Sequence, residues 1–518
     1  MPRRLLVTLA LLLASFTAAA QERRPPTPTP SPSATTEKSK DEKEGDKKAK
    51  EEKPPSVTRH QITVAGKPLA YTATAGYMPM KDESGKLKAN IFFIAYTKDG
   101  ASPRRPITFA FNGGPGSSSV WLHMGALGPK RVVMTDEGWA PPPPYRLVDN
   151  EQTWLAFTDV VFIDPVTTGF SRAAEGEKPE QFHGLDEDIQ SVGEFIRLYS
   201  TKYGRWGAPK FLAGESYGTT RAAGLSGYLQ QRYGMYLNGI TLISTILNFQ
   251  TARFDVGNDL PYLLFLPTYT TTAWYHKKLP ADLQGDFQKA VSESEAFAMS
   301  EYPLALMKGD RLQGNDRKAI VAKLARLTGL APAVLEENDL RVDLPTFNTE
   351  LLRSENKTVG RLDSRFTMPG RPAGDRNIGS DPSYAAIYGV YTAMLNDYVR
   401  GELKYENDLP YEILTNRVRP WNYSPYQNQY VNVAETLRGA IVQNPALRVL
   451  FCAGYYDFAT PYFAAQYTME HMGLDPVLQK NLRLEHFDAG HMMYIQKTSL
   501  EKLTRTVAAF YKDAAPEP

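Results

Sequence analysis

The chain has 518 residues, of which 42% are hydrophobic and 22% charged, so it is long enough to bury a large core. Its 59 basic and 57 acidic residues give a net charge of +2, which excludes a strongly basic nucleic-acid-binding protein and a strongly acidic solvating one. Cys452 is the single cysteine, and the seven histidines include no His-x-x-x-His pair. We therefore expect no intrachain disulfide, no cofactor and no metal site.

The first twenty residues have the layout of a secretory signal. Arg3 and Arg4 are basic, residues 5–16 are apolar, and a run of small residues ends at Ala20. A transmembrane anchor is the alternative, but the apolar run is shorter than the roughly 20 residues needed to cross a bilayer. We predict cleavage near Ala20, a periplasmic or secreted location, and no membrane anchor in the mature chain.

Residues 21–56 have the composition of a disordered linker. Residues 27–33 alternate Pro with Thr or Ser, and residues 37–53 contain seven acidic and seven basic side chains with almost nothing to bury. Such a segment cannot offset the entropy lost on ordering. A spacer is the simplest interpretation, and a tail that binds the cell wall or a partner is the alternative.

From residue 57 onward, the pattern of strands and helices predicts an α/β fold. Residues 61–64 and 91–96 have the pattern of two strands of a hairpin. Apolar runs predict buried strands over 107–111, 160–163, 210–213, 240–246, 447–453 and 482–487. Helices are predicted over 185–203, 219–233 and 499–511. Continuous apolar strands separated by helices indicate a mostly parallel sheet with helices on both faces.

The alternation stops in the middle of the chain. Residues 249–430 are rich in Tyr, Leu and Pro and are expected to be helical, as an inserted cap over the sheet. The core would then consist of two parts, residues 57–248 and residues 431–518.

Gly214-Glu215-Ser216-Tyr217-Gly218 lies between a predicted strand and a predicted helix. This is the context of a nucleophile elbow, in which the serine Oγ projects above the edge of the sheet. The N-terminus of the following helix favours negative charge that develops nearby. A plain strand-to-helix turn is the alternative.

A glycine-rich loop, residues 112–119, follows the strand over 107–111. Main-chain N–H groups in such a loop can point into a site without obstruction by side chains. In this architecture, an oxyanion hole takes one N–H from such a loop and one from the residue after the nucleophile. A phosphate-binding loop is the rival interpretation, but its Gly-Lys-Ser/Thr ending is missing.

Asp457 and His491 each follow a predicted strand. Together with Ser216 they give the chain order Ser, Asp, His at the carboxyl ends of strands, as a hydrolase triad requires. Asp488 is the second candidate for the acid, but it lies too close in sequence to His491 to orient its ring easily. His486 is expected to pack within its strand.

These motifs resemble those of the serine carboxypeptidase family of α/β-hydrolases, in an exported bacterial branch. The resemblance covers residues 100–495 except the predicted cap, and the loop 112–118 combined with Glu215-Ser216-Tyr217 is its most specific part. It implies an α/β-hydrolase core and an enzyme that removes C-terminal residues from peptides at acidic pH.

The resemblance also implies how catalysis is shared among residues. Ser216 would be the nucleophile, His491 the general base and then acid, and Asp457 the carboxylate that orients His491. The main-chain N–H groups of Gly114 and Tyr217 would form the oxyanion hole.

Three further residues, Asn112, Gly113 and Glu215, would hold the C-terminal carboxylate of the substrate. Glu215 beside a carboxylate requires a shared proton, because two close carboxylates cannot both ionise cheaply, and this favours an acidic optimum. Two positions depart from the family: Ser117 replaces a cysteine, and Ala126 replaces a second glutamate. With one glutamate only, we expect activity to extend closer to neutrality than in typical relatives.

Two other functions stay open at this point. One is an ester hydrolase or acyltransferase that uses the same triad. The other is a non-catalytic binding protein, which the intact Ser, Asp, His and oxyanion loop argue against. The partners expected for a carboxypeptidase are peptides with a free C-terminus, and no nucleic acid.

Overall fold

The computed structural model describes residues 54–369 and 381–516. The predicted signal and almost all of the predicted linker lie outside the described residues. The described residues form one compact unit, and its first strand begins at Ser56, the last residue of the predicted linker. Within the described ranges, no helix is both long enough and apolar enough to cross a membrane.

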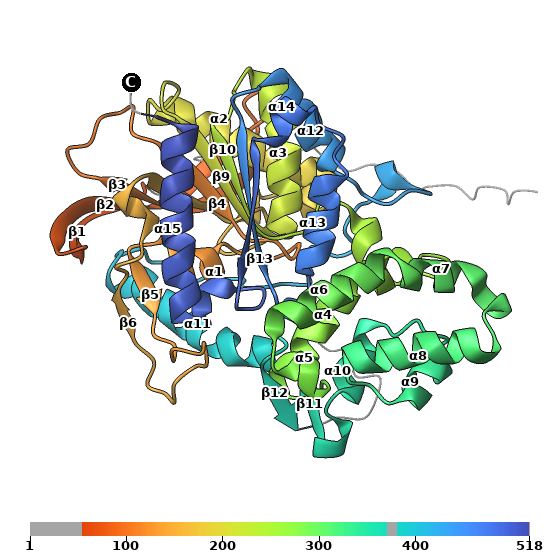
Figure 1. Cartoon of the computed structure of the whole chain (residues 1–518). Coiled ribbons are helices and arrows are strands. Elements are labelled where there is room, and N and C mark those ends of the chain that lie inside the picture. The colour runs from red at the N-terminus through yellow and green to blue at the C-terminus, as the bar shows by residue number, and fades with distance from the viewer. Residues whose placement is uncertain (1–53, 370–380, 517–518) are drawn as a thin grey trace, which may run out of the picture. The chain divides into compact units, whose positions relative to one another are not determined.

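A ten-stranded sheet forms the centre of this unit (Figure 1). The order of its strands is β1-β2-β3-β7-β4-β9-β10-β13-β14. The tenth strand, β8, lies off this path and pairs with β3. The strands are β1 (Ser56–Val64), β2 (Lys67–Lys81), β3 (Leu87–Lys98), β4 (Ile107–Phe111), β7 (Asp159–Ile163), β8 (Arg172–Ala173), β9 (Lys210–Ser216), β10 (Gly239–Thr245), β13 (Arg448–Gly454) and β14 (Leu482–Phe487). Along this order, neighbouring strands from β1 to β7 run antiparallel, and neighbouring strands from β7 to β14 run parallel. The predicted fold class is therefore confirmed.

The predicted hairpin between residues 61–64 and 91–96 is wrong. Both segments are strands, but β2 lies between them in the sheet and pairs with each. The sequence pattern of β2 is weak because Ala and Thr dominate its first half, and Gly76 and Pro79 are residues that strands usually avoid.

Helices cover both faces of the sheet because its strands are apolar on both sides. Phe109 and Phe111 pack on one face, with α2, α3 and α12, whereas Ala110 between them packs on the other, with α11 and α15. These helices are α2 (Leu185–Lys202), α3 (Tyr217–Tyr233), α11 (Pro382–Gly401), α12 (Ala434–Gln443) and α15 (Lys497–Ala514). The helices predicted over 185–203, 219–233 and 499–511 are confirmed.

The stretch 249–430, expected as a cap, contains two kinds of helix. The first group, green in Figure 1, shares an apolar cluster that is separate from the two clusters at the sheet. It consists of α4 (Leu260–Tyr275), α5 (Ala281–Gln284), α6 (Phe287–Met299), α7 (Glu301–Lys308), α8 (Gly314–Thr328), α9 (Pro332–Glu337) and α10 (Leu344–Glu350). In contrast, α11 buries Ile387, Val390 and Tyr391 in the cluster at the sheet. The boundaries of a cap domain stay a prediction.

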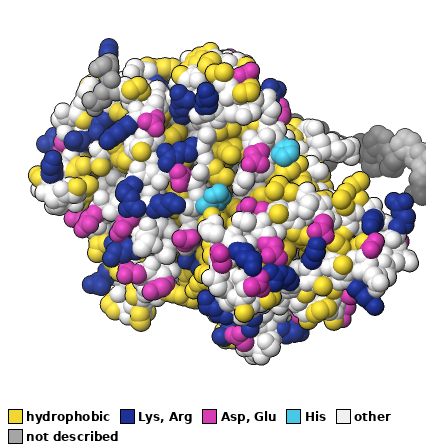
Figure 2. Space-filling model, viewed as in Figure 1, with side chains coloured by type: hydrophobic (Ala, Val, Ile, Leu, Met, Phe, Trp, Pro, Cys, Tyr) yellow, Lys and Arg dark blue, Asp and Glu magenta, His cyan; other side chains and the backbone are white. Residues whose placement is uncertain are grey.

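Charged side chains of both signs lie interspersed on the face of the molecule drawn in Figure 2. On the helices of the first group, Arg326 pairs with Asp282 and Glu293, and Lys323 pairs with Glu301.

Candidate active site

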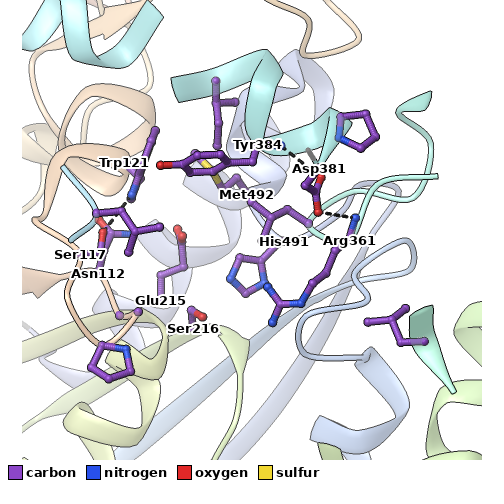
Figure 3. A pocket seen from close by; sticks show the side chains of 18 of the residues that line it. Asn112, Ser117, Trp121, Glu215, Ser216, Arg361, Asp381, Tyr384, His491 and Met492 are labelled. Atoms are coloured by element: carbon purple, nitrogen blue, oxygen red, sulfur yellow. Dashed lines mark hydrogen bonds between the residues drawn. The ribbon is translucent and has the colours of Figure 1, made fainter. Parts of the chain in front are cut away.

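The four loops singled out by sequence lie at one edge of the sheet. They follow β4, β9, β13 and β14, and the carboxyl ends of parallel strands meet at the same edge. A pocket of about 780 Å³ opens there, and Asn112, Glu215, Ser216 and His491 line it (Figure 3). This volume is typical of small-molecule binding sites.

Ser216 has the strained backbone of a nucleophile elbow. It ends β9 and directly precedes α3, with φ 59° and ψ −129°, a region that residues other than glycine rarely occupy. The hydroxyl of Thr219 donates a hydrogen bond to the carbonyl oxygen of Ser216 at 2.6 Å and so stabilises the first turn of α3. The turn holds Ser216 at the pocket, above the N-terminus of the helix.

His491 is oriented by a buried carboxylate. Its Nδ1 lies 2.8 Å from Oδ2 of Asp457. Oδ1 of Asp457 accepts hydrogen bonds from the N–H groups of Ala459 (2.8 Å) and Thr460 (3.0 Å), and Oδ2 accepts one from the Thr460 hydroxyl (2.8 Å). Burial lowers the pKa of His491, but the Asp457 carboxylate outweighs burial, so the pKa lies above its usual value.

The loop that carries His491 is fixed by residues distant in sequence. The N–H of His491 donates to the carbonyl oxygen of Leu362 at 2.6 Å, and that of Gly490 donates to Oδ2 of Asp363 at 3.0 Å. The hydroxyl of Ser244 donates to the carbonyl oxygen of His491, also at 2.6 Å. Asp363 and Ser244 escaped sequence analysis, because neither stands in a motif.

The two competing residues near His491 lie elsewhere. Asp488 is exposed. His486 lies within β14, where its ring stacks on that of Tyr455 with 5.1 Å between centroids, so it packs in its strand as predicted.

The glycine-rich loop packs main chain against main chain on the elbow. A Cβ atom added to Gly113 would lie 2.6 Å from the main-chain nitrogen of Gly218, so only glycine allows this approach. The far end of the loop is tied down by the N–H of Ser119, which donates to Oδ1 of Asp164 at 2.9 Å. The loop thus brings Gly113 and Gly114 to the N-terminus of α3, beside Tyr217.

Asn112 presents an unpartnered donor at the pocket. Its Oδ1 accepts a hydrogen bond from the N–H of Leu122 at 3.1 Å, and its main-chain oxygen accepts one from the guanidinium of Arg221 at 2.6 Å. Its Nδ2 is buried and makes no well-aligned hydrogen bond within the described residues, although the Asn112 side chain lies close enough to Glu215 and Tyr494 to lower the pKa of both groups. A buried donor without a partner is costly, which suggests that a ligand supplies the acceptor.

Glu215 is buried beside Ser216. Burial raises the pKa of its carboxyl to about 7, although the nearby His491 and a hydrogen bond donated by the Tyr494 hydroxyl both lower it. At pH values well below 7, the Glu215 carboxyl is therefore mostly protonated and can act as a hydrogen-bond donor.

The two positions that depart from the family have local explanations. Ala126 is fully buried in the apolar cluster at the sheet, and its carbonyl oxygen accepts a hydrogen bond from Asn150 at 2.7 Å. Ser117 accepts a hydrogen bond from Nε1 of Trp121 at 3.0 Å. At these positions, neither a second carboxyl nor a thiol is available.

The rest of the pocket comes from residues that sequence analysis did not single out. Trp121, Tyr384, Ile387 and Met492 supply apolar surface, and Arg361, Asp381 and Arg419 are charged. In Figure 3, Trp121 and Arg361 lie on opposite sides of His491. Within the described ranges, no three His, Cys, Asp or Glu residues are grouped so that they could hold a metal ion.

Several known serine carboxypeptidases are similar to this chain. The model of the serine carboxypeptidase family matches residues 64–507. The pheromone-processing carboxypeptidase KEX1 of Cryptococcus gattii is 32% identical over 160 residues, which are 30% of this chain and 22% of that protein. Serine carboxypeptidase-like 50 of Arabidopsis thaliana is 25% identical over 289 residues, 53% of this chain and 58% of that protein. Both matches span less than two thirds of the relative's length.

The crystal structure of a prohormone-processing carboxypeptidase, Kex1Δp of Saccharomyces cerevisiae, has a similar fold. The TM-score is 0.54 at 17% identity, with 85% of this chain and 91% of that chain covered. The likeness confirms the α/β-hydrolase fold.

Proposed function

The chain belongs to the serine carboxypeptidase family, and we propose that it removes single residues from the free C-terminus of peptides. One observation carries the proposal. The unpartnered amide of Asn112 and the carboxyl of Glu215 line the same pocket as Ser216 and His491. A carboxylate bound there would lie beside the nucleophile, so the last peptide bond is the one within reach.

In the proposed reaction, Ser216 is the nucleophile and His491 its base. Because Nδ1 of His491 is hydrogen-bonded to Asp457, Nε2 is left to accept the proton of the Ser216 hydroxyl. Oγ then attacks the carbonyl carbon of the last peptide bond, and the N–H groups of Gly114 and Tyr217 stabilise the oxyanion. His491 returns the proton to the leaving amino group, and water releases the acyl group from Ser216 by the reverse steps.

Recognition of the C-terminus would use three donors. Nδ2 of Asn112, the N–H of Gly113 and the protonated carboxyl of Glu215 would each donate to the substrate carboxylate. Hydrogen bonds to a charged group are stronger than those between neutral groups, which favours free-acid substrates over capped ones.

The proposed roles imply a bell-shaped pH dependence for free-acid substrates. Activity should rise as His491 loses its proton and fall as Glu215 loses its own, close to its pKa of about 7. Because the pKa of His491 lies above its usual value of 6.5 and that of Glu215 is about 7, the two limbs lie close together and the optimum would be narrow and near neutrality. Ester substrates, which have no carboxylate, should lack the fall that Glu215 causes.

The test compares peptide pairs that differ only at the C-terminus. A library of free-acid peptides and their amidated twins is incubated with the wild type and with Ser216→Ala, and products are identified by mass spectrometry. Stepwise loss of C-terminal residues from the free acids alone, absent in Ser216→Ala, is the expected result. Equal cleavage of both twins, or hydrolysis of esters only, would contradict the proposal and favour an ester hydrolase.

We also propose that the enzyme is exported, as a periplasmic or secreted member of the expected bacterial branch, with cleavage near Ala20. The basic, apolar and small-residue order of residues 3–20 supports this. N-terminal sequencing of the protein from its host should find a start near Gln21. An intact Met1 would contradict export by cleavage.

A further inference from the structure

Tyr494 contacts the carboxyl of Glu215 directly. Its hydroxyl donates a hydrogen bond to Oε2 of Glu215, and both side chains are buried, with 2% and 3% exposure. Tyr494 lies three residues after His491, in the short turn Met493–Ile495. The same loop therefore carries both the base and a partner of the residue before the nucleophile.

The ring of Tyr494 packs against Gly125, which lies in the helical turn His123–Leu127 beyond the glycine-rich loop. A Cβ atom added to Gly125 would lie 2.5 Å from the Tyr494 ring and 2.8 Å from the hydroxyl oxygen of Tyr391. The next residue, Ala126, brings no ionisable group. Tyr494 and Tyr391 thus pack around Gly125 beside the buried carboxyl of Glu215. Within the described residues, Tyr494 is hydrogen-bonded to that carboxyl and Tyr391 is not.

Each element packed around Glu215 contributes an identifiable group. His491 and Asp457 come from the loops after β14 and β13, Tyr391 comes from α11, and Tyr494 from its own turn. Protonated His491 favours the ionised carboxyl, whereas Asp457 and burial favour the neutral one. The side chain of Asn112, in the loop after β4, also favours the ionised carboxyl. Of all these groups, Tyr494 makes the well-aligned hydrogen bond to the carboxyl in the described structure.

We propose that Tyr494 is a positioning residue for Glu215, which fixes its carboxyl for the substrate carboxylate and sets the pH at which that recognition is lost. This inference rests on the proposed function. The Tyr494 hydrogen is donated to Oε2, so the carboxyl proton is carried by Oε1 and is available to the substrate. When the proton leaves, the same hydrogen bond stabilises the anion. Tyr494 therefore couples the geometry of the carboxyl to its ionisation.

The test is Tyr494→Phe, which removes the hydroxyl and keeps the ring. On free-acid peptides at pH 5, kcat/KM should fall roughly tenfold, mainly through KM, because one neutral hydrogen bond is lost. The alkaline limb of kcat/KM should move up by about one pH unit, because the anion loses a donor. Ester substrates should be hydrolysed as by the wild type. Tyr391→Phe is the matched control. It should change neither kcat/KM on free-acid peptides at pH 5 nor the position of the alkaline limb.

Two outcomes would overturn the role of Tyr494. One is a shift of the alkaline limb of kcat/KM in Tyr391→Phe that equals the shift in Tyr494→Phe. The other is a shift that persists when Tyr494→Phe is combined with Glu215→Gln, since no carboxyl then titrates.

A spectroscopic titration separates this role from the proposed function. The protonated-carboxyl infrared band that disappears in Glu215→Gln is followed against pH in the ligand-free wild type and in Tyr494→Phe. A higher pKa in Tyr494→Phe supports the proposal even if the enzyme proves not to be a carboxypeptidase, and an unchanged pKa overturns it.

Discussion

Nδ1 of His491 lies 2.8 Å from Oδ2 of Asp457, a carboxylate that also receives two main-chain N–H groups and the hydroxyl of Thr460. This set of donors fixes the carboxylate, and the carboxylate in turn fixes the tautomer and orientation of the imidazole ring. Nε2 is left for Ser216. The arrangement leads to a direct expectation for each triad residue.

Ser216→Ala and His491→Ala should each lower kcat by roughly 10⁴–10⁶, because either change removes the nucleophilic mechanism. Asp457→Asn should lower kcat by about 10⁴, because the amide favours the wrong tautomer of the His491 ring. Steady-state kinetics measure these losses. Labelling with a fluorophosphonate probe checks the nucleophile, and equal labelling of the wild type and Ser216→Ala would show that the assignment is wrong.

Gly113→Ala should abolish most activity. The added Cβ atom would lie 2.6 Å from the main-chain nitrogen of Gly218, so the loop must move away from the elbow. Loss of an aligned oxyanion donor costs roughly 10²–10³ in kcat. The matched control is Gly439→Ala in α12, where nothing lies within 4 Å of the added atom. If both variants keep full activity and circular dichroism finds both folded, the loop does not supply an oxyanion donor.

Glu215→Gln should make the protein more stable at neutral pH than the wild type. The folded-state pKa of Glu215, about 7, lies above its usual value of 4.5, so the folded wild type loses stability as pH rises between these values. The neutral amide has no such loss, and the difference should grow to roughly 3 kcal/mol by pH 7 and level off above it.

Urea unfolding of the wild type and Glu215→Gln at pH 5, 6, 7 and 8 measures this difference. A difference that stays constant over this range would mean that Glu215 has an ordinary pKa, and the proposed alkaline limb would then need another origin.

The parts of the fold and site that sequence predicted are those with a local pattern. The elbow at Ser216, the loop at Gly113 and the strands before Asp457 and His491 each combine an apolar run with a distinctive turn, and all lie where expected. The strand β2 was missed because its apolar residues are small and interrupted. The local sequence pattern was therefore enough to predict the catalytic loops, but it was not enough to predict the strand β2 near the edge of the sheet.

The residues that escaped prediction act across long sequence separations. Asp363 holds the loop of His491 from 127 positions away, and Tyr494 reaches Glu215 over 279. Neither residue stands in a motif, because a buried tyrosine or aspartate can occur anywhere in a core and leaves no recognisable sequence pattern. Trp121 and Tyr384 join the pocket for the same reason, through α1 (Val120–Leu122) and α11.

The central claim is that the pocket recognises a substrate carboxylate, and Asn112 tests it most directly. Two substrates are compared that form the same acyl-enzyme: a blocked dipeptide with a free carboxylate, and the ethyl ester of its blocked first residue. In Asn112→Ala, kcat/KM for the dipeptide should fall by about 10–150-fold, the value of one hydrogen bond to a charged group. The rate on the ester should change far less. An equal loss on both substrates would show that Asn112 only supports the loop, and would contradict recognition of the C-terminal carboxylate.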